Sequence, residues 1–80
     1  MNASLVHKKI TDINPDEYQQ ISVLDLSFNI IIDTNNILKL KNLTILNLTG
    51  NQIRLINTID LPNLEILILH LWKFKTPIYL

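Results

Sequence analysis

The chain has no cysteine, a single glycine and no net charge, and each of these features excludes a class of function. Without cysteine there are no disulfides, no thiolate nucleophile and no zinc–thiolate site. The single glycine, Gly50, excludes a glycine-rich phosphate loop. Seven lysine and arginine residues balance seven aspartate and glutamate residues. Electrostatic attraction to nucleic acid or to an anionic membrane is therefore not expected.

Long hydrophobic runs are also missing. The runs Ile30–Ile32 and Ile66–Leu69 are far too short to span a bilayer. Residues 1–10 contain two lysines and lack the apolar segment of a signal peptide. The 80 residues are 48% hydrophobic and 18% charged, a composition that favours one small folded domain over a disordered tail. We therefore expect a cytoplasmic or nuclear protein.

No combination of side chains indicates an enzyme. Asp16 and Glu17 are adjacent carboxylates, but acidic residues at the start of a helix explain them equally well. His70 has no second ligand nearby for a metal, and His7 is too distant to serve as one. We expect no catalytic residue, no bound metal and no cofactor.

An eleven-residue pattern fits the chain three times. In Leu43–Ile53, apolar residues stand at positions 1, 4, 6 and 11 and an asparagine at position 9. Ile21–Ile31 matches at all five positions, and the pattern recurs from Leu64 with Trp72 in the asparagine position. The starts are 22 and 21 residues apart. We interpret the chain as one array with a partial first repeat (1–20), two full repeats (21–42 and 43–63) and a degenerate last repeat with a tail (64–80).

Each repeat is expected to contain one short strand and one helical or extended return. The predicted strands are Val23–Leu26, Ile45–Leu48 and Ile66–Leu69, and the predicted helical turns are Pro15–Gln20, Ile37–Lys41 and Thr58–Leu61. Because side chains alternate along a strand, the leucines should face the core and the residues between them should face outward. Eleven residues before each repeat start stand Ile10, Ile32 and Ile53, and the extra residue of the 22-residue spacing is expected somewhere between Ile30 and Asn35.

The recurring asparagine has a physical explanation. A tight turn after each strand leaves backbone groups buried between repeats, and an asparagine side chain can both donate to them and accept from them. Asn29 and Asn51 can form such a ladder. Lys8 and Trp72 occupy the same position at the two ends of the array, where the ladder would stop.

The segments Leu24–Asn29 and Asn51–Arg54 resemble the short, 21–22-residue class of leucine-rich repeats, including those of the regulatory leucine-rich subunit of type 1 protein phosphatase. The resemblance covers about residues 3–71. It implies an α/β fold, a leucine-rich repeat solenoid with a short parallel β-sheet on its concave face and helical turns or extended segments on its convex face. It also implies a non-enzymatic module that binds a protein partner through the concave sheet.

The outward-facing positions match the ligand-facing columns of that family. The predicted partner-binding residues are Val23, Asp25, Ser27, Phe28, Ile45, Asn47, Thr49, Ile66, Ile68 and His70. For Phe28, the alternative to anchoring a partner is that its ring folds over a neighbouring repeat. For Val23, Ile45 and Ile66, the alternative to a binding groove is packing between neighbouring strands.

Two other interpretations of the function stay open. The chain resembles a phosphatase regulatory scaffold, which would make a phosphatase catalytic subunit its partner. It also resembles a fragment of a larger leucine-rich repeat receptor or surface protein. In either case the array has no recognisable cap, so self-association through its uncapped ends is a further possibility. The aromatic tail could instead fold back as a makeshift cap.

Overall fold

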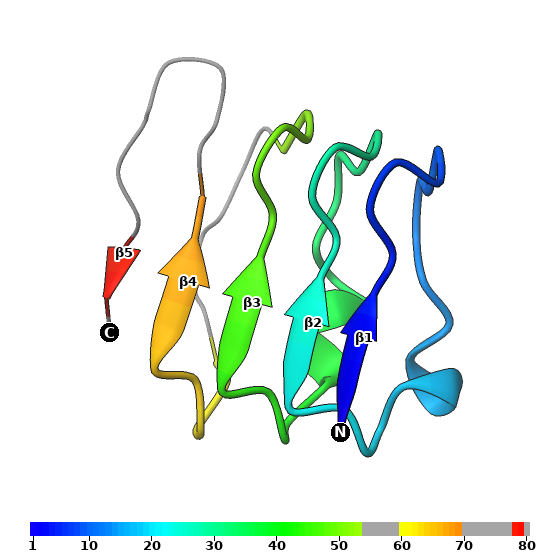
Figure 1. The fold of residues 1–80 in the computed structure, drawn as a ribbon. Helices are drawn as coiled ribbons and strands as arrows, with labels where there is room; N and C mark the ends of the chain where they lie inside the picture. Colours follow the sequence, from blue (N-terminus) through cyan, green and yellow to red (C-terminus); the bar gives the residue numbers. More distant parts are fainter. Residues whose placement is uncertain (54–59, 70–77, 80) are drawn as a thin grey trace.

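The molecule is built around one five-stranded sheet, seen in a computed structural model that describes residues 1–53, 60–69 and 78–79 (Figure 1). The strands lie side by side in chain order, β1-β2-β3-β4-β5. The first four are parallel, and β5 pairs antiparallel with β4. Their bounds are β1 Asn2–Ser4, β2 Val23–Asp25, β3 Ile45–Asn47, β4 Ile66–Ile68 and β5 Ile78–Tyr79. The prediction of a short parallel sheet is confirmed.

The three central strands begin where the repeat pattern predicts and end one residue earlier. Backbone pairing itself continues, since the Leu26 N–H donates to the Asn47 carbonyl at 2.9 Å. However, the Asp25 carboxylate accepts from the Ser27 N–H at 2.9 Å and thereby turns the backbone. The same bond recurs in the next repeat, where Asn47 Oδ1 accepts from the Thr49 N–H at 3.0 Å. A side-chain cap therefore ends β2 and β3.

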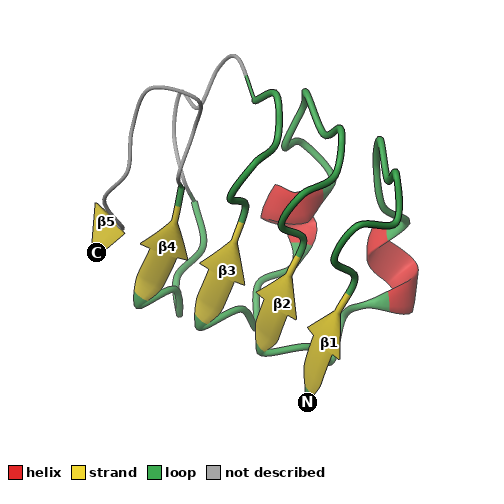
Figure 2. Cartoon of the chain, turned by 45° about the horizontal axis from the view of Figure 1, so that its top comes forward, coloured by secondary structure: helices red, strands yellow, loops and turns green. Residues whose placement is uncertain are grey.

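Helix is nearly absent from the described residues. Only two single-turn 3-10 helices occur, η1 (Pro15–Glu17) and η2 (Ile37–Lys39), each in a segment that connects two strands (Figure 2). Asn14 caps η1 as its sequence position indicates, with its side-chain oxygen accepting from the Asp16 N–H at 3.1 Å. Both helices are shorter than predicted. The chain enters the core again soon after each of them, and this leaves no room for a second turn.

The third predicted turn, Thr58–Leu61, falls partly outside the described residues. None of the helices in the described ranges is long and apolar enough to cross a membrane.

The core lies behind the sheet, between the strands and the segments that return to them (Figure 1). Leu24, Leu46 and Leu67 stand in register on neighbouring strands and are almost completely buried. Each such side chain contributes about 1.5–3 kcal/mol on removal from water. The predicted inward positions are confirmed. Further buried apolar residues are Ile13, Ile21, Leu26, Ile31, Ile37, Leu40, Leu43, Leu48, Ile53, Leu61, Leu64 and Leu69.

The repeat spacing alone does not decide whether Ile31 or Ile32 continues the column of Ile10 and Ile53, and the structure does. Ile32 is exposed, and its neighbour Ile31 is fully buried in its place. The hydrogen bonds explain why Ile31 and not Ile32 is buried, because the Ile31 N–H donates to Asn51 just as the Ile10 N–H donates to Asn29. Ile31 therefore belongs to the column of Ile10, and the extra residue of the 22-residue repeat falls after Ile31.

An asparagine ladder joins the repeats, as predicted. Asn29 Oδ1 accepts from the N–H groups of Lys8 at 2.9 Å and Ile10 at 3.0 Å. Its Nδ2 donates to the carbonyls of Leu5 at 2.8 Å and Leu26 at 2.9 Å. The buried side chain thus ties the turn after β2 to the turn after β1, and no apolar side chain could replace it.

Asn51 repeats this arrangement one strand further on. Its Oδ1 accepts from the Ile31 N–H at 3.0 Å, and its Nδ2 donates to the carbonyls of Leu26 at 2.8 Å and Leu48 at 3.1 Å. The Leu26 carbonyl accepts from both asparagines, so the two side chains form one continuous network. At one end of the ladder stands Lys8, as predicted. Trp72 lies outside the described residues.

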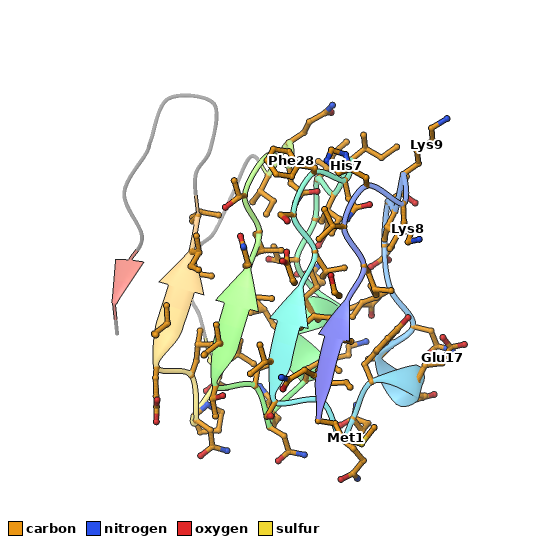
Figure 3. All side chains as sticks on the ribbon, in the orientation of Figure 1. Met1, His7, Lys8, Lys9, Glu17 and Phe28 are labelled. Atoms are coloured by element: carbon orange, nitrogen blue, oxygen red, sulfur yellow. The ribbon has the colours of Figure 1, made fainter. Side chains whose placement is uncertain are left out.

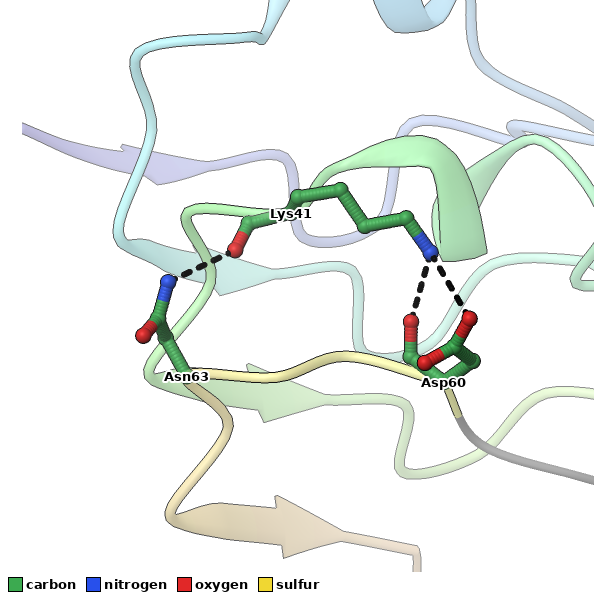
Figure 4. Close-up of polar contacts among 3 residues, drawn as sticks. All are labelled: Lys41, Asp60 and Asn63. Atoms are coloured by element: carbon green, nitrogen blue, oxygen red, sulfur yellow. Dashed lines mark hydrogen bonds and ion pairs between the residues drawn. The ribbon is translucent and has the colours of Figure 1, made fainter.

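A second amide ladder, which was not predicted, runs along the opposite ends of the strands. Asn42 Nδ2 donates to the Gln19 carbonyl at 2.7 Å, and Asn63 Nδ2 donates to the Lys41 carbonyl at 3.0 Å (Figure 4). Lys41 also bonds the Asp60 carbonyl through Nζ at 2.6 Å. The repeat that starts at Leu43 is therefore attached to the one before it at both ends of its strand.

Candidate protein-binding face

The outward residues of β2, β3 and β4 form two straight columns across the sheet. The strand register aligns Val23, Ile45 and Ile66 in one column and Asp25, Asn47 and Ile68 in the other. All six are half-buried. Neighbouring strands lie about 4.8 Å apart, so each column extends roughly 10 Å. We call these six residues the sheet face.

Within the described residues, backbone covers only one side of the sheet. In Figure 1 the described return segments lie behind the strands, and none of them crosses the near side. The first strand continues the columns with Asn2 beside Val23 and Ser4 beside Asp25. The face therefore changes across the sheet, from polar at β1 to apolar at β4.

The two polar members of the sheet face are held in place by their own turns. Asp25 Oδ1 accepts from the Ser27 N–H and from the Ser27 hydroxyl, the latter at 2.6 Å. Asn47 Oδ1 accepts from the Thr49 N–H. These bonds fix the side chains in orientation, which lowers the entropy lost when a partner binds them.

Ser27 is buried, contrary to the prediction that it faces outward with the other candidate partner-binding residues. Only 4% of it is exposed, because its hydroxyl turns in to donate to Asp25. The backbone bend after Asp25 breaks the strand alternation on which the prediction relied. Thr49, the matching residue after β3, stays half-buried at the margin of the face.

Phe28 lies in the turn beyond β2, away from the strands (Figure 3). Its ring is stacked on the His7 ring, with centroids 4.9 Å apart. It also lies against Gly50, since a methyl group there would stand 2.6 Å from Phe28 Cδ1. The ring thus packs over both neighbouring repeats, yet half of the residue remains exposed. His70, the last predicted partner-binding residue, falls outside the described residues.

Sequence reasoning missed His7 and the second amide ladder. The sequence contains a recurring position that indicates each of them. His7, Phe28 and Gly50 occupy the same position in successive repeats, and Asn42 and Asn63 directly precede the starts of theirs.

Within the described ranges, no three histidine, aspartate or glutamate side chains are placed to hold a metal ion. Comparisons of the chain with protein-family models, with curated proteins and with solved structures found no match.

Proposed function

We propose that the chain is a short leucine-rich repeat solenoid that binds a protein partner through the sheet face and catalyses no reaction. Three features of the fold support the solenoid. The strands follow one another in chain order, the buried leucines keep a period of 21–22 residues, and the asparagine network passes from repeat to repeat. Such stacks present a continuous sheet surface that suits extended partners.

The observation that carries the binding proposal is the apolar character of the sheet face. A sheet with one open side normally alternates apolar residues inward with polar residues outward. Here four of the six outward residues, Val23, Ile45, Ile66 and Ile68, are apolar, and they adjoin one another in the register. A contiguous apolar surface with a polar border is typical of the centre of a protein interface.

Asp25 gives this surface a charge on its polar side. Its carboxylate stands in register with Asn47 and beside the apolar column, and the turn holds it rigidly. A partner that pairs apolar side chains with a lysine or arginine would complement this arrangement. In such a contact the charge contributes mainly to specificity and to the association rate.

The test is quantitative affinity capture of partner proteins by the wild-type chain and by Ile45→Glu. Ile45 is in the middle of the apolar column, so a carboxylate there would have to be desolvated in any complex through this face. We expect capture to fall at least about tenfold. Gln20→Glu is the matched control, because Gln20 is exposed outside the strands and the variant has the same charge.

Circular dichroism and urea unfolding of both variants must show an intact fold for the comparison to count. Equal capture by wild type and a folded Ile45→Glu would refute the proposal. Asn47→Arg is a weaker test, because losing the Asn47 side chain also removes the acceptor for the Thr49 N–H. Asp25→Asn keeps the turn's acceptor oxygen and changes only the charge, so it isolates the contribution of the carboxylate.

A further inference from the structure

A second apolar patch lies away from the sheet face, in the segment Phe28–Ile32. Phe28 is 50% exposed, Ile30 41% and Ile32 46%, and with Met1 they are the large exposed hydrophobic residues of the described chain. Ile31 between the two isoleucines is fully buried. Because neighbouring side chains of an extended segment point to opposite sides, Ile30 and Ile32 both face outward.

The neighbouring repeats show that the fold does not require these apolar residues. Lys9 and Gln52 occupy the position of Ile30 in the repeats before and after, and both are exposed. Thr11 follows Ile10 where Ile32 follows Ile31, and it is exposed as well. The same backbone position thus accepts polar side chains in adjacent repeats. The isoleucines therefore need an explanation other than packing.

A positively charged turn borders this patch. The Ile30 N–H donates to the Ile10 carbonyl at 3.0 Å, and His7 stacks on Phe28, so residues 7–10 lie directly against the segment. Lys9 extends away from the ribbon at this edge (Figure 3), and both Lys8 and Lys9 are exposed. Within the described part of the chain, neither ammonium group forms an ion pair or a hydrogen bond.

The carboxylates that adjoin this region in the sequence, Asp12 and Asp33, accept hydrogen bonds from neutral amide groups and form no ion pair with Lys8 or Lys9. Asp12 accepts from the Ile13 N–H through Oδ1 and from Asn36 through Oδ2, both at 2.8 Å. Asp33 accepts from the N–H of Asn35 at 2.7 Å and from its side chain at 3.3 Å. Both carboxylates keep their charge, so the patch has a negative charge at Asp33 beside Ile32 and a positive end at Lys8 and Lys9, where a partner's carboxylates can pair.

The fixed ring of Phe28 favours a peptide over a lipid surface. His7 from the preceding repeat and Gly50 from the following one hold the ring flat against the turns. A side chain held in this way cannot extend into a bilayer. It can serve as a preorganised anchor for a peptide side chain at low entropic cost.

We propose that His7, Lys9, Phe28, Ile30 and Ile32 form a second docking surface, which binds a short peptide segment of a partner protein that places apolar side chains next to carboxylates. The apolar side chains would cover Ile30, Ile32 and the exposed part of the Phe28 ring. The carboxylates would pair with Lys9 and with its neighbour Lys8. This surface is separate from the sheet face and does not depend on the function proposed for it.

The test starts with selection of binders from a random peptide library on the immobilised full chain. Selected peptides are then labelled, and fluorescence anisotropy measures their affinity for variants. The patch variant, Ile30→Gln with Ile32→Thr, carries at each position the kind of residue found in a neighbouring repeat, so the fold should tolerate it. We expect peptides that combine apolar and acidic residues, with affinity falling at least about tenfold in the patch variant.

Lys9→Gln should also lower the affinity of these peptides. The loss of affinity should be smaller at high salt because the contact is ionic. Ile45→Glu, on the sheet face, should leave their affinity unchanged. Three results would overturn the proposal: no peptide whose binding depends on the patch, selected peptides without carboxylates, or loss of binding in Ile45→Glu but not in the patch variant. Patch-dependent sedimentation with phosphatidylserine vesicles, without peptide binding, would assign the surface to membranes instead.

Discussion

The imidazole ring of His7 lies parallel to the phenyl ring of Phe28, with centroids 4.9 Å apart and planes inclined by 6°. Both residues have a left-handed backbone, with φ of 56° and 57°, and Gly50 in the next repeat has φ of 72°. Outside glycine this conformation costs about 1–2 kcal/mol. An aromatic stack returns about 0.5–1.5 kcal/mol. The stack therefore offsets part of the strain of two successive turns.

Replacing Gly50 with alanine should destabilise the chain by about 1–3 kcal/mol, as judged by urea unfolding. The new methyl group would stand 2.6 Å from Phe28 Cδ1, and φ at this position is unfavourable for alanine. The double variant Phe28→Ala with Gly50→Ala removes the steric clash and keeps the backbone strain. Its loss of stability should be smaller than the sum of the two single losses. If the loss in the double variant equalled the sum of the two single losses, the close contact between Phe28 and position 50 would be contradicted.

Asn29→Ala should cost about 2–4 kcal/mol in the free energy of unfolding. It leaves the N–H groups of Lys8 and Ile10 and the Leu5 carbonyl without their partner, while the Leu26 carbonyl keeps its bond from Asn51. Each unpaired buried group costs about 1–3 kcal/mol, less any bond recovered from water. Asn29→Asp should be similarly harmful, because a carboxylate cannot donate to the carbonyls. The control is Asn35→Ala at an exposed site, for which we expect less than about 0.5 kcal/mol. Similar losses of stability in Asn29→Ala and Asn35→Ala would show that the asparagine ladder does not stabilise the fold.

Neighbouring residues of β3 should respond very differently to truncation. Leu46 is 2% exposed, and Leu46→Ala should cost about 2–5 kcal/mol because it leaves a cavity in the core. Ile45 faces outward on the same strand, and Ile45→Ala should cost about 1 kcal/mol or less. Parallel urea titrations would check the difference. Equal losses would mean that Ile45 belongs to the core and not to a binding surface.

Asp25 offers a way to separate the turn from the charge. Asp25→Asn keeps the oxygen that accepts from the Ser27 N–H and hydroxyl, so we expect a change in stability of less than about 1 kcal/mol. Asp25→Ala removes both hydrogen bonds and should cost about 1–3 kcal/mol. Thermal unfolding of the two variants side by side measures this. A loss of more than about 1 kcal/mol in Asp25→Asn would show that the negative charge itself holds the turn.

The repeat period was enough to predict the parallel sheet, the inward leucines and the asparagine ladder, because each follows from a side chain that recurs at a fixed spacing. Leu24, Leu46 and Leu67 are buried in register, and Asn29 and Asn51 bond the turns between them. Such features depend on the repeat as a unit. The period predicts them correctly even though each of these strands has only three residues in regular pairing.

Three features that the period did not predict depend on local contacts that interrupt the regular pattern. Ser27 was predicted to face outward, but its hydrogen bonds to Asp25 bury it. The spacing alone did not decide between Ile31 and Ile32, and the bond that the Ile31 N–H donates to Asn51 Oδ1 selects Ile31 for the core. The stack of His7 on Phe28 needs left-handed backbone at two non-glycine residues, a conformation that neither residue type signals.

Site-specific photo-crosslinking tests the central claim, that the sheet face binds a protein partner, most directly. A photoreactive phenylalanine analogue is placed at position 45 on the sheet face, at position 30 in the second patch, or at position 20 as an exposed control. Adducts are then compared by mass after irradiation with the captured partner. We expect a strong adduct from position 45 and none from position 20. No adduct from position 45, or equal adducts from positions 45 and 20, would contradict binding through the sheet face.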